Sequence, residues 1–461
     1  MKKTNKLFTI LFIFTLIFSS CNTSDLDPSL EQSKSVEGSI KTVSDVEGII
    51  KGAYNIFTGS GYYGRDFIIN GEVRSDNCFS NGNSGRFTTE ASFGYNSNTG
   101  FMFDDAYRVI AAANIVIAVD ISKLTGDAAF GVHLQGQAYA IRALAHFDLV
   151  KMYGQQHAGG TLGIPYVKEF KGSDLFPSRG TVVSNKADIY TDFEMAYSKM
   201  SAAYYNSSKE FMSQMTAKAL ESRAAIYFGD YSRAKSAAQV VMNSSLYSII
   251  PAANYVSSWA GKANGNSIFE LAFNSSDNLG SNSLGYMYRR AGAVPGYGDV
   301  QVINEVAAIY AVGDVRAGIL GREDADNKLR NIGKYPNNQG YDNVVVIRYE
   351  EVVLNYAEAL FEEGGASVAL AMGQLNSITS RRGAAAYTAV TKADILNERR
   401  KELIFEGFRF DDLMRTGAGI VKGAAQMNLA ATLTYPNNLF AWPIPQAEID
   451  ANSNMTQNVG Y

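Results

Sequence analysis

The chain has 461 residues, of which 46% are hydrophobic and 19% are charged, and its formal net charge is −4. This composition is ordinary for a globular protein and excludes wholesale disorder. A slightly acidic chain without a Lys/Arg-rich tract also argues against nucleic-acid binding. The length allows one large or two medium domains with an ample core.

The N-terminus has the features of an export signal. A short basic start precedes the apolar run 7–18, which is too short to cross a bilayer core of ~30 Å. Two serines then precede Cys21, an arrangement similar to the bacterial lipobox, although Phe18 stands where that pattern prefers Leu. We therefore predict removal of residues 1–20, lipidation of Cys21 and a polar tether over 21–40. The alternative is an ordinary signal peptide with an incidental cysteine.

Helical periodicity marks most of the first half of the chain. A Ser/Asp/Val/Glu sequence at 44–47 predicts a capping box, and apolar residues follow it at helical spacing. Between the first helix and the second, residues 59–103 are rich in Gly, Asn, Ser and aromatics without a period, which predicts a long loop insertion. The predicted helices of this half are 46–57, 104–120, 134–153 and 185–200.

The second half contains helix pairs whose small residues recur at the crossing positions. Residues 214–244 predict two helices in about 34 residues, a degenerate tetratricopeptide-like spacing, and 349–381 predict another pair. A Gly/Asn-rich insertion separates them at 254–343, with short strand-like runs, and a final helix is predicted to end near Gly407. We expect a mainly α fold: tetratricopeptide-like stacked helix pairs, long loop insertions and a few short strands, in a single domain over 41–461.

The sequence offers no positive sign of catalysis. Three histidines without metal-ligand spacing do not predict a zinc site. A G-x-G-x-x-G sequence at 59–64 follows a predicted helix rather than a strand, so a loop explains it better than a dinucleotide site does. With Cys21 assigned to lipid, Cys78 has no partner for an intramolecular disulfide. We expect no enzyme activity, no cofactor and no catalytic or metal-binding residues.

One C-terminal segment, 398–415, interleaves both charge signs with apolar residues, which favours structural ion pairs over an active site. It strongly resembles the C-terminal motif of the SusD/RagB family of outer-membrane nutrient-binding lipoproteins. Other stretches resemble that family in the same order, although Val459 stands where many members carry Pro. They are 138–154, 163–165, 178–182, 189–193, 314–316, 348–360, 443–448 and 457–461.

The resemblance implies a SusD-like α-superhelix at the cell surface. Such a lipoprotein captures oligosaccharide or polysaccharide and passes it to a SusC-type TonB-dependent outer-membrane transporter. Asp25 and Asp27, soon after Cys21, are similar to a surface-export signal of these lipoproteins, so we expect a lipid anchor in the outer membrane facing the exterior. The alternatives are a peptide-binding member of the family and a helical-repeat adaptor of the transporter with no ligand of its own.

Family members build their ligand surface from loops near the first helices and from the large insertion, which correspond here to 59–103 and 275–300. Sugars need apolar platforms for their C–H faces and planar polar groups for their hydroxyls. The alternative for each tyrosine is packing within its own loop. The predicted ligand-binding residues are Asp76, Asn77, Arg86, Tyr95, Asn96, Tyr286, Tyr288 and Arg289.

Overall fold

A computed structural model describes residues 39–170, 176–290, 296–323, 326–337, 339–423 and 428–461. Cys21, Asp25 and Asp27 lie outside the described residues, as do the predicted signal and nearly all of the predicted tether. Residues Thr42–Tyr461 form one compact unit, and its fold is mainly α, as predicted. Among the described helices, none is both long enough and apolar enough to cross a membrane.

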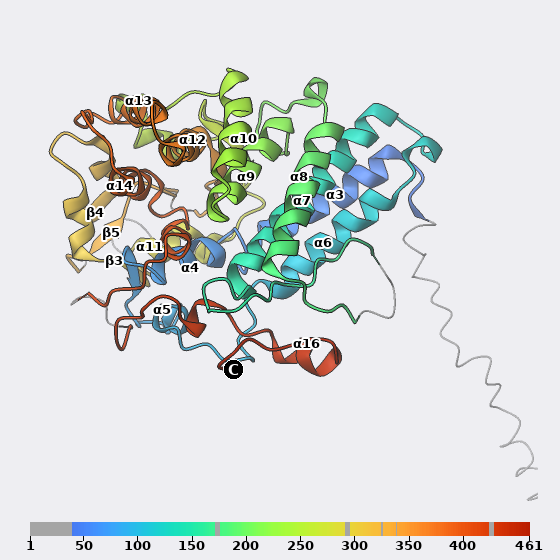
Figure 1. Ribbon diagram of the computed structural model, residues 1–461, viewed down its shortest axis with the longest axis horizontal. Helices are drawn as coiled ribbons and strands as arrows, with labels where there is room; N and C mark the ends of the chain where they lie inside the picture. Colours follow the sequence, from blue (N-terminus) through green and yellow to red (C-terminus); the bar gives the residue numbers. More distant parts are fainter. Residues whose placement is uncertain (1–38, 171–175, 291–295, 324–325, 338, 424–427) are drawn as a thin grey trace, which may run out of the picture. The chain divides into compact units, whose positions relative to one another are not determined.

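The first half of the unit contains four helices, α3, α6, α7 and α8, that lie side by side (Figure 1). The long helix α7 begins six residues before the apolar periodicity does, because the Asp127 carboxylate caps it by accepting from the backbone N–H groups of Ala129 and Phe130. Helix α3 packs on α6, α6 on α7 and α7 on α8. Their bounds are α3 Val43–Phe57, α6 Phe103–Ala118, α7 Ala128–Tyr153 and α8 Val182–Lys199.

The predicted capping box at 44–47 was wrong by two residues. Helix α3 is instead capped by Thr42, whose side chain accepts from the Asp45 N–H at 3.1 Å, while the Asp45 carboxylate accepts from the Thr42 N–H at 2.8 Å. These two reciprocal hydrogen bonds join residues three positions apart, as a capping box requires. With the cap at Thr42, Val43 becomes the first residue of the helix and lies in the core.

The stack continues through the second half. Helix α9 packs on α8 and α10, α10 packs on α12, and α12 packs on both α13 and α14, so the predicted helix pairs form one continuous array. Buried alanines such as Ala217, Ala224 and Ala234 line these contacts and let the helices approach closely. The bounds are α9 Gln214–Tyr227, α10 Tyr231–Asn243, α12 Tyr349–Glu363, α13 Ser367–Thr379 and α14 Lys392–Leu403.

The prediction of an irregular loop over 59–103 was wrong in part. This segment contains helix α4 (Asp66–Val73), strand β1 (Cys78–Ser80) and the short helix α5 (Thr88–Ser92). Every residue of α4 after the first is buried, including Asn70 and Glu72. A helix surrounded by protein on all sides has no polar face, so its sequence shows no amphipathic period.

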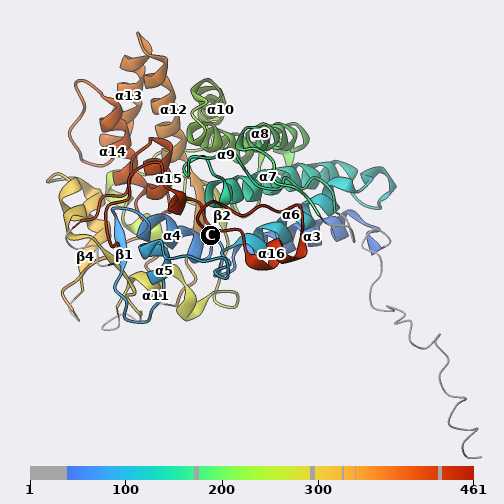
Figure 2. The ribbon, with the colours of Figure 1, turned by 60° about the horizontal axis from the view of Figure 1, so that its bottom comes forward.

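The two insertions meet through strand pairing. Strand β1 pairs antiparallel with β3, placing Cys78 opposite Val302 and Ser80 opposite Val300. Figure 2 shows β1, α4 and α5 of the first insertion in the same part of the structure as α11 of the second. The remaining pairs are β2 with β6 and β4 with β5. The second insertion contains β2 Ser267–Leu271, α11 Leu284–Tyr288, β3 Val300–Val302, β4 Leu320–Arg322 and β5 Leu329–Asn331, and β6 Val344–Arg348 follows it.

The C-terminal segment closes against the first insertion. Helix α15 (Arg409–Arg415) contacts α4, and helix α16 (Gln446–Ala451) follows near the chain end. The approach is so close that a Cβ atom on Gly71 of α4 would lie 2.1 Å from the carbonyl oxygen of Gly407. Gly407 itself adopts a φ of +86°, a conformation that favours glycine. Both glycines are therefore required where these two segments meet.

Candidate functional site

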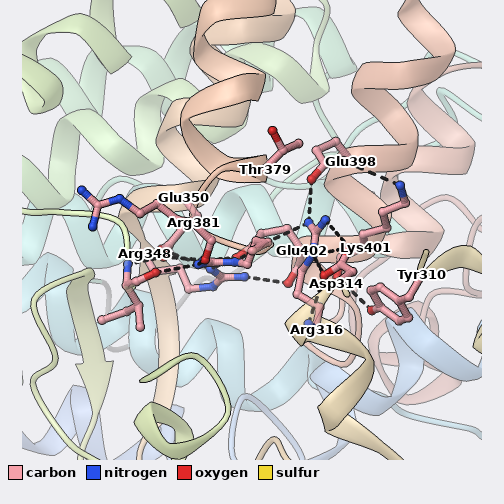
Figure 3. Close-up of polar contacts among 12 residues, drawn as sticks. Tyr310, Asp314, Arg316, Arg348, Glu350, Thr379, Arg381, Glu398, Lys401 and Glu402 are labelled. Atoms are coloured by element: carbon pink, nitrogen blue, oxygen red, sulfur yellow. Dashed lines mark hydrogen bonds and ion pairs between the residues drawn. The ribbon is translucent and has the colours of Figure 1, made fainter. Parts of the chain in front are cut away.

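Two glutamates of the segment 398–415, Glu398 and Glu402, form a buried ion-pair cluster with arginines from distant segments (Figure 3). Glu402 of α14 is its centre, since its carboxylate accepts from Arg382 at 2.7 Å, Arg348 at 2.9 Å and Arg316 at 3.2 Å. Arg316 also pairs with Glu398 at 2.7 Å. We call Asp314, Arg316, Arg348, Glu350, Arg382, Glu398 and Glu402 the Glu402 cluster.

Burial and counter-charges act in opposite directions on the Glu402 carboxyl. Burial alone raises its pKa, but the guanidinium groups of Arg382 and Arg348 outweigh that effect and hold the pKa well below its usual range. The side chains of the cluster are almost fully inaccessible to solvent. The expectation of structural ion pairs is confirmed, because a ligand cannot reach these groups in this structure.

Tyr95 lies in an aromatic box around a buried cation. Its ring stacks on Trp442 with centroids 4.1 Å apart, and only 6% of the residue is exposed. The Arg74 guanidinium lies 5.5 Å from the Tyr95 centroid and 3.8 Å from that of Phe410. Cation–π attraction of this kind compensates a desolvated guanidinium. In this structure Tyr95 therefore stabilises the fold and does not offer a face to a ligand.

Asp76 and Asn77 attach the first insertion to the C-terminal helices. The Asp76 carboxylate accepts from Arg409 at 2.6 and 2.9 Å and forms an ion pair with Arg400 at 3.2 Å. Asn77 is fully buried; it accepts from Arg400 at 2.9 Å and donates to Glu72 at 2.9 Å. Their polar groups are engaged within the protein, which leaves them little capacity to bind sugar hydroxyls.

Tyr288 and Arg289 are also engaged internally. Tyr288 has no exposed surface, and its ring packs against Phe405 with centroids 5.4 Å apart. Burial raises the pKa of its hydroxyl well above the ordinary value. The Arg289 guanidinium donates to Glu323 at 2.5 Å. Neither side chain presents a free recognition group in this arrangement.

Two predicted residues, Arg86 and Tyr286, both contact the ring of Tyr297 at the surface. Tyr297 was not among the predicted ligand-binding residues. The Arg86 guanidinium lies 4.5 Å from the ring centroid of Tyr297 and forms an ion pair with Asp299 at 2.9 Å. Tyr297 is 41% exposed, and its ring lies 5.8 Å from that of Tyr286. The Asn81 amide donates to the Gly298 carbonyl at 2.6 Å. We call Asn81, Arg86, Tyr286 and Tyr297 the Arg86–Tyr297 surface.

Asn96 lies elsewhere, in an exposed turn where its side-chain oxygen accepts from the Asn98 N–H at 3.0 Å. Tyr297 was missed because residues 291–296 before it give no periodic signal, but its position between Gly296 and Gly298 could have marked it as a loop-tip aromatic. Among the described residues, no group of three or more His, Cys, Asp or Glu side chains is arranged to hold a metal ion.

Two family models match the chain. The model described as "SusD family" matches residues 327–461, and the one described as "Starch-binding associating with outer membrane" matches residues 26–227. The chain belongs to the SusD family. The first match contains residues 398–415, the segment that carries the resemblance. The second contains helices α3, α6, α7 and α8.

Similar proteins agree with this assignment. The starch-binding protein SusD of Bacteroides thetaiotaomicron is 32% identical over 145 residues, which cover 30% of this chain and 24% of that protein. SusD-like protein P38 of Formosa agariphila is 23% identical, with 98% of each chain covered. The crystal structure of a SusD superfamily protein from Bacteroides vulgatus has a TM-score of 0.83 and 29% identity, covering 92% of this chain and 100% of that one.

Proposed function

We propose that this SusD family member is a cell-surface lipoprotein that captures an oligosaccharide or polysaccharide without altering it. Family membership supports the ligand class, since one matching model is described as starch-binding and one relative is named a starch-binding protein. The Arg86–Tyr297 surface carries the proposal within this chain, because it joins both insertions that were expected to form the ligand surface.

The chemistry of that surface suits a sugar. The exposed Tyr297 ring offers a flat apolar platform for C–H groups, and the Arg86 guanidinium supplies a planar polar group for hydroxyls. Asp299, which is nearly buried, fixes the Arg86 guanidinium over the ring, so the side chain is ordered before the ligand arrives. Aromatic contacts contribute roughly 0.5–1.5 kcal/mol each, so one such surface gives only modest affinity.

Delivery to a SusC-type TonB-dependent transporter completes the proposal. The match to a model described as "associating with outer membrane" supports outer-membrane attachment, and lipidation at Cys21 would provide the anchor. If the ligand also contacts the transporter, that second contact compensates for weak binding at the Arg86–Tyr297 surface, since linked weak contacts give high avidity. In this proposal the chain captures the ligand, and the SusC-type transporter then transports it.

Calorimetry of the purified protein against a panel of soluble polysaccharides tests the proposal, with chromatography of the recovered sugar. We expect binding to at least one polysaccharide and an unchanged chain-length distribution. Shortened product would contradict the view of a binding protein without catalysis. Binding to peptides but to no glycan would favour the peptide-binding alternative, and absence of any ligand would favour the transporter adaptor.

A further inference from the structure

An apolar recess lies between α6, the connection before α8 and the C-terminal segment, and it shares no residue with the Arg86–Tyr297 surface. Its volume is about 220 Å³. Pockets for drug-sized ligands typically measure roughly 300–1,000 Å³, so this recess suits a single ring or branched chain. Its apolar wall includes Phe103, Ile110, Ala111, Val167, Phe170 and Met455.

Two carboxylates line this recess: that of Asp104 in α6, which is exposed, and that of Glu448 in α16, which is half-buried. Within the part of the chain that the structure describes, neither carboxylate has an ion-pair or hydrogen-bond partner. Burial raises the pKa of the Glu448 carboxyl, and the negative charge of Asp104 raises it further.

Nearby cations are committed to other partners. Arg179 is buried and donates to the carbonyl oxygens of Gly163 at 2.7 Å and Tyr153 at 2.9 Å. Arg108, on the outer face of α6, pairs with Asp105 at 3.1 Å. Among the described residues, the Asp104 and Glu448 carboxylates therefore give the lining of the recess a negative potential.

The recess opens beside a larger groove. This groove measures about 620 Å³ and shares Phe103 and Asp104 with the recess, and polar residues such as Asn98 and Gln446 are part of its lining. A ligand seated in the recess can thus extend into open, polar surroundings. An apolar recess bordered by uncompensated carboxylates is complementary to a molecule that combines an apolar group with a positive charge.

We propose that this recess binds an organic ammonium ligand, with its apolar ring or branched chain inside the recess and its protonated amine next to Asp104 and Glu448. The amine supplies the missing counter-charge, and the apolar part displaces water from the walls. The site is separate from the proposed glycan surface and does not depend on it.

Phenethylamine is a suitable probe, and the Met455 methyl group in the recess wall is a suitable reporter. In the purified protein with ¹³C-methyl methionine, we expect phenethylamine to shift the Met455 signal, which the Met455→Leu variant identifies. The neutral 2-phenylethanol should bind about ten-fold more weakly, and the anionic 3-phenylpropionate should not shift the signal. Equal responses to the amine and the anion would overturn the proposal.

Variants of the recess test the contribution of the carboxylate charge and that of the apolar cavity separately. Glu448→Gln removes one charge and should weaken phenethylamine binding about three-fold. Ala111→Leu fills the recess from α6 and should abolish the Met455 shift. Glu305→Gln, an exposed carboxylate outside both cavities, is the matched control and should change nothing. Unchanged affinity in Glu448→Gln, or a Met455 shift that persists in Ala111→Leu, would contradict the assignment.

Discussion

The Glu402 cluster and the Arg86–Tyr297 surface both combine arginines with carboxylates, but the cluster stabilises the fold and the surface is proposed to bind a ligand. In the cluster, three arginines share one buried carboxylate, and other acids and backbone carbonyls accept from their remaining donors. At the surface, one arginine pairs with one aspartate and leaves a tyrosine ring 41% exposed. Burial and the number of partners, rather than residue type, thus distinguish a structural site from a recognition site.

Removing the centre of the cluster should have the largest effect on stability. Glu402→Ala leaves three buried guanidinium groups without their shared carboxylate, and breaking a buried ion pair in this way costs about 3–5 kcal/mol. Equilibrium unfolding in urea, followed by circular dichroism, measures the change. A loss below about 1 kcal/mol would show that the cluster does not hold the C-terminal segment in place.

Glu363 provides the matched control for that experiment. It lies at the end of α12, exposed, and its carboxylate pairs with Lys235 at 2.7 Å. Exposed ion pairs are screened by solvent and contribute little. The Glu363→Ala variant should therefore keep the wild-type urea midpoint. A shift as large as that of Glu402→Ala would mean that acid removal in general, not loss of the buried centre, destabilises the protein.

Stability should also depend on pH through Glu72. This buried carboxyl accepts from the Gly407 N–H at 2.9 Å, and burial raises its pKa from 4.5 to about 7. The folded state therefore binds this proton more tightly than the unfolded state does, so the stability contribution is present at low pH and is lost as pH rises from 4.5 to about 7.

The Glu72→Gln variant isolates this contribution, since an amide keeps a hydrogen-bond acceptor but cannot ionise. The free energy of unfolding of wild type, relative to the variant, should fall by about 2–3 kcal/mol as pH rises from about 4.5 to about 7.5. Urea titrations of both proteins at several pH values measure the difference. Parallel pH profiles would show that the Glu72 carboxyl keeps an ordinary pKa.

A smaller effect is expected from the geometry of Arg86. Lysine keeps the positive charge but lacks the planar guanidinium that lies over Tyr297 and reaches Asp299. Arg86→Lys should weaken glycan binding about two- to four-fold and leave the urea midpoint unchanged. Calorimetry with the polysaccharide identified in the panel measures this change. Full affinity in the variant would leave charge, rather than ordered geometry, as the contribution of residue 86.

The helical stack could be predicted because its helices are amphipathic or have regularly spaced small residues. Helix α4 could not, since it is buried on nearly all sides and lacks a polar face. Helix α14 could also be predicted, because Thr391 and Asp394 form a capping box at its start. A helix could be predicted wherever the residues that determine it lie within a few positions of one another in the sequence.

The predicted ligand residues depended on contacts over long sequence distances. Tyr95 is buried because Trp442 stacks on it, and Asp76 is neutralised by Arg409, 333 residues later in the chain. A tyrosine in a polar loop looks exposed until such partners are known. Arg86 and Tyr286 remain at the surface because strand pairing between β1 and β3 brings their segments together there. Residue type predicted the region, and tertiary partners determined which residues in it are available.

The most direct test of recognition by the Arg86–Tyr297 surface is the affinity of Tyr297→Ala for the bound polysaccharide. Phe176→Ala, which removes a ring that is 50% exposed on the connection before α8, is its matched control. We predict that calorimetry shows an affinity about five- to ten-fold lower for Tyr297→Ala, corresponding to roughly 1–1.5 kcal/mol, and wild-type affinity for Phe176→Ala. Undiminished binding by a correctly folded Tyr297→Ala protein would contradict this assignment of the glycan site.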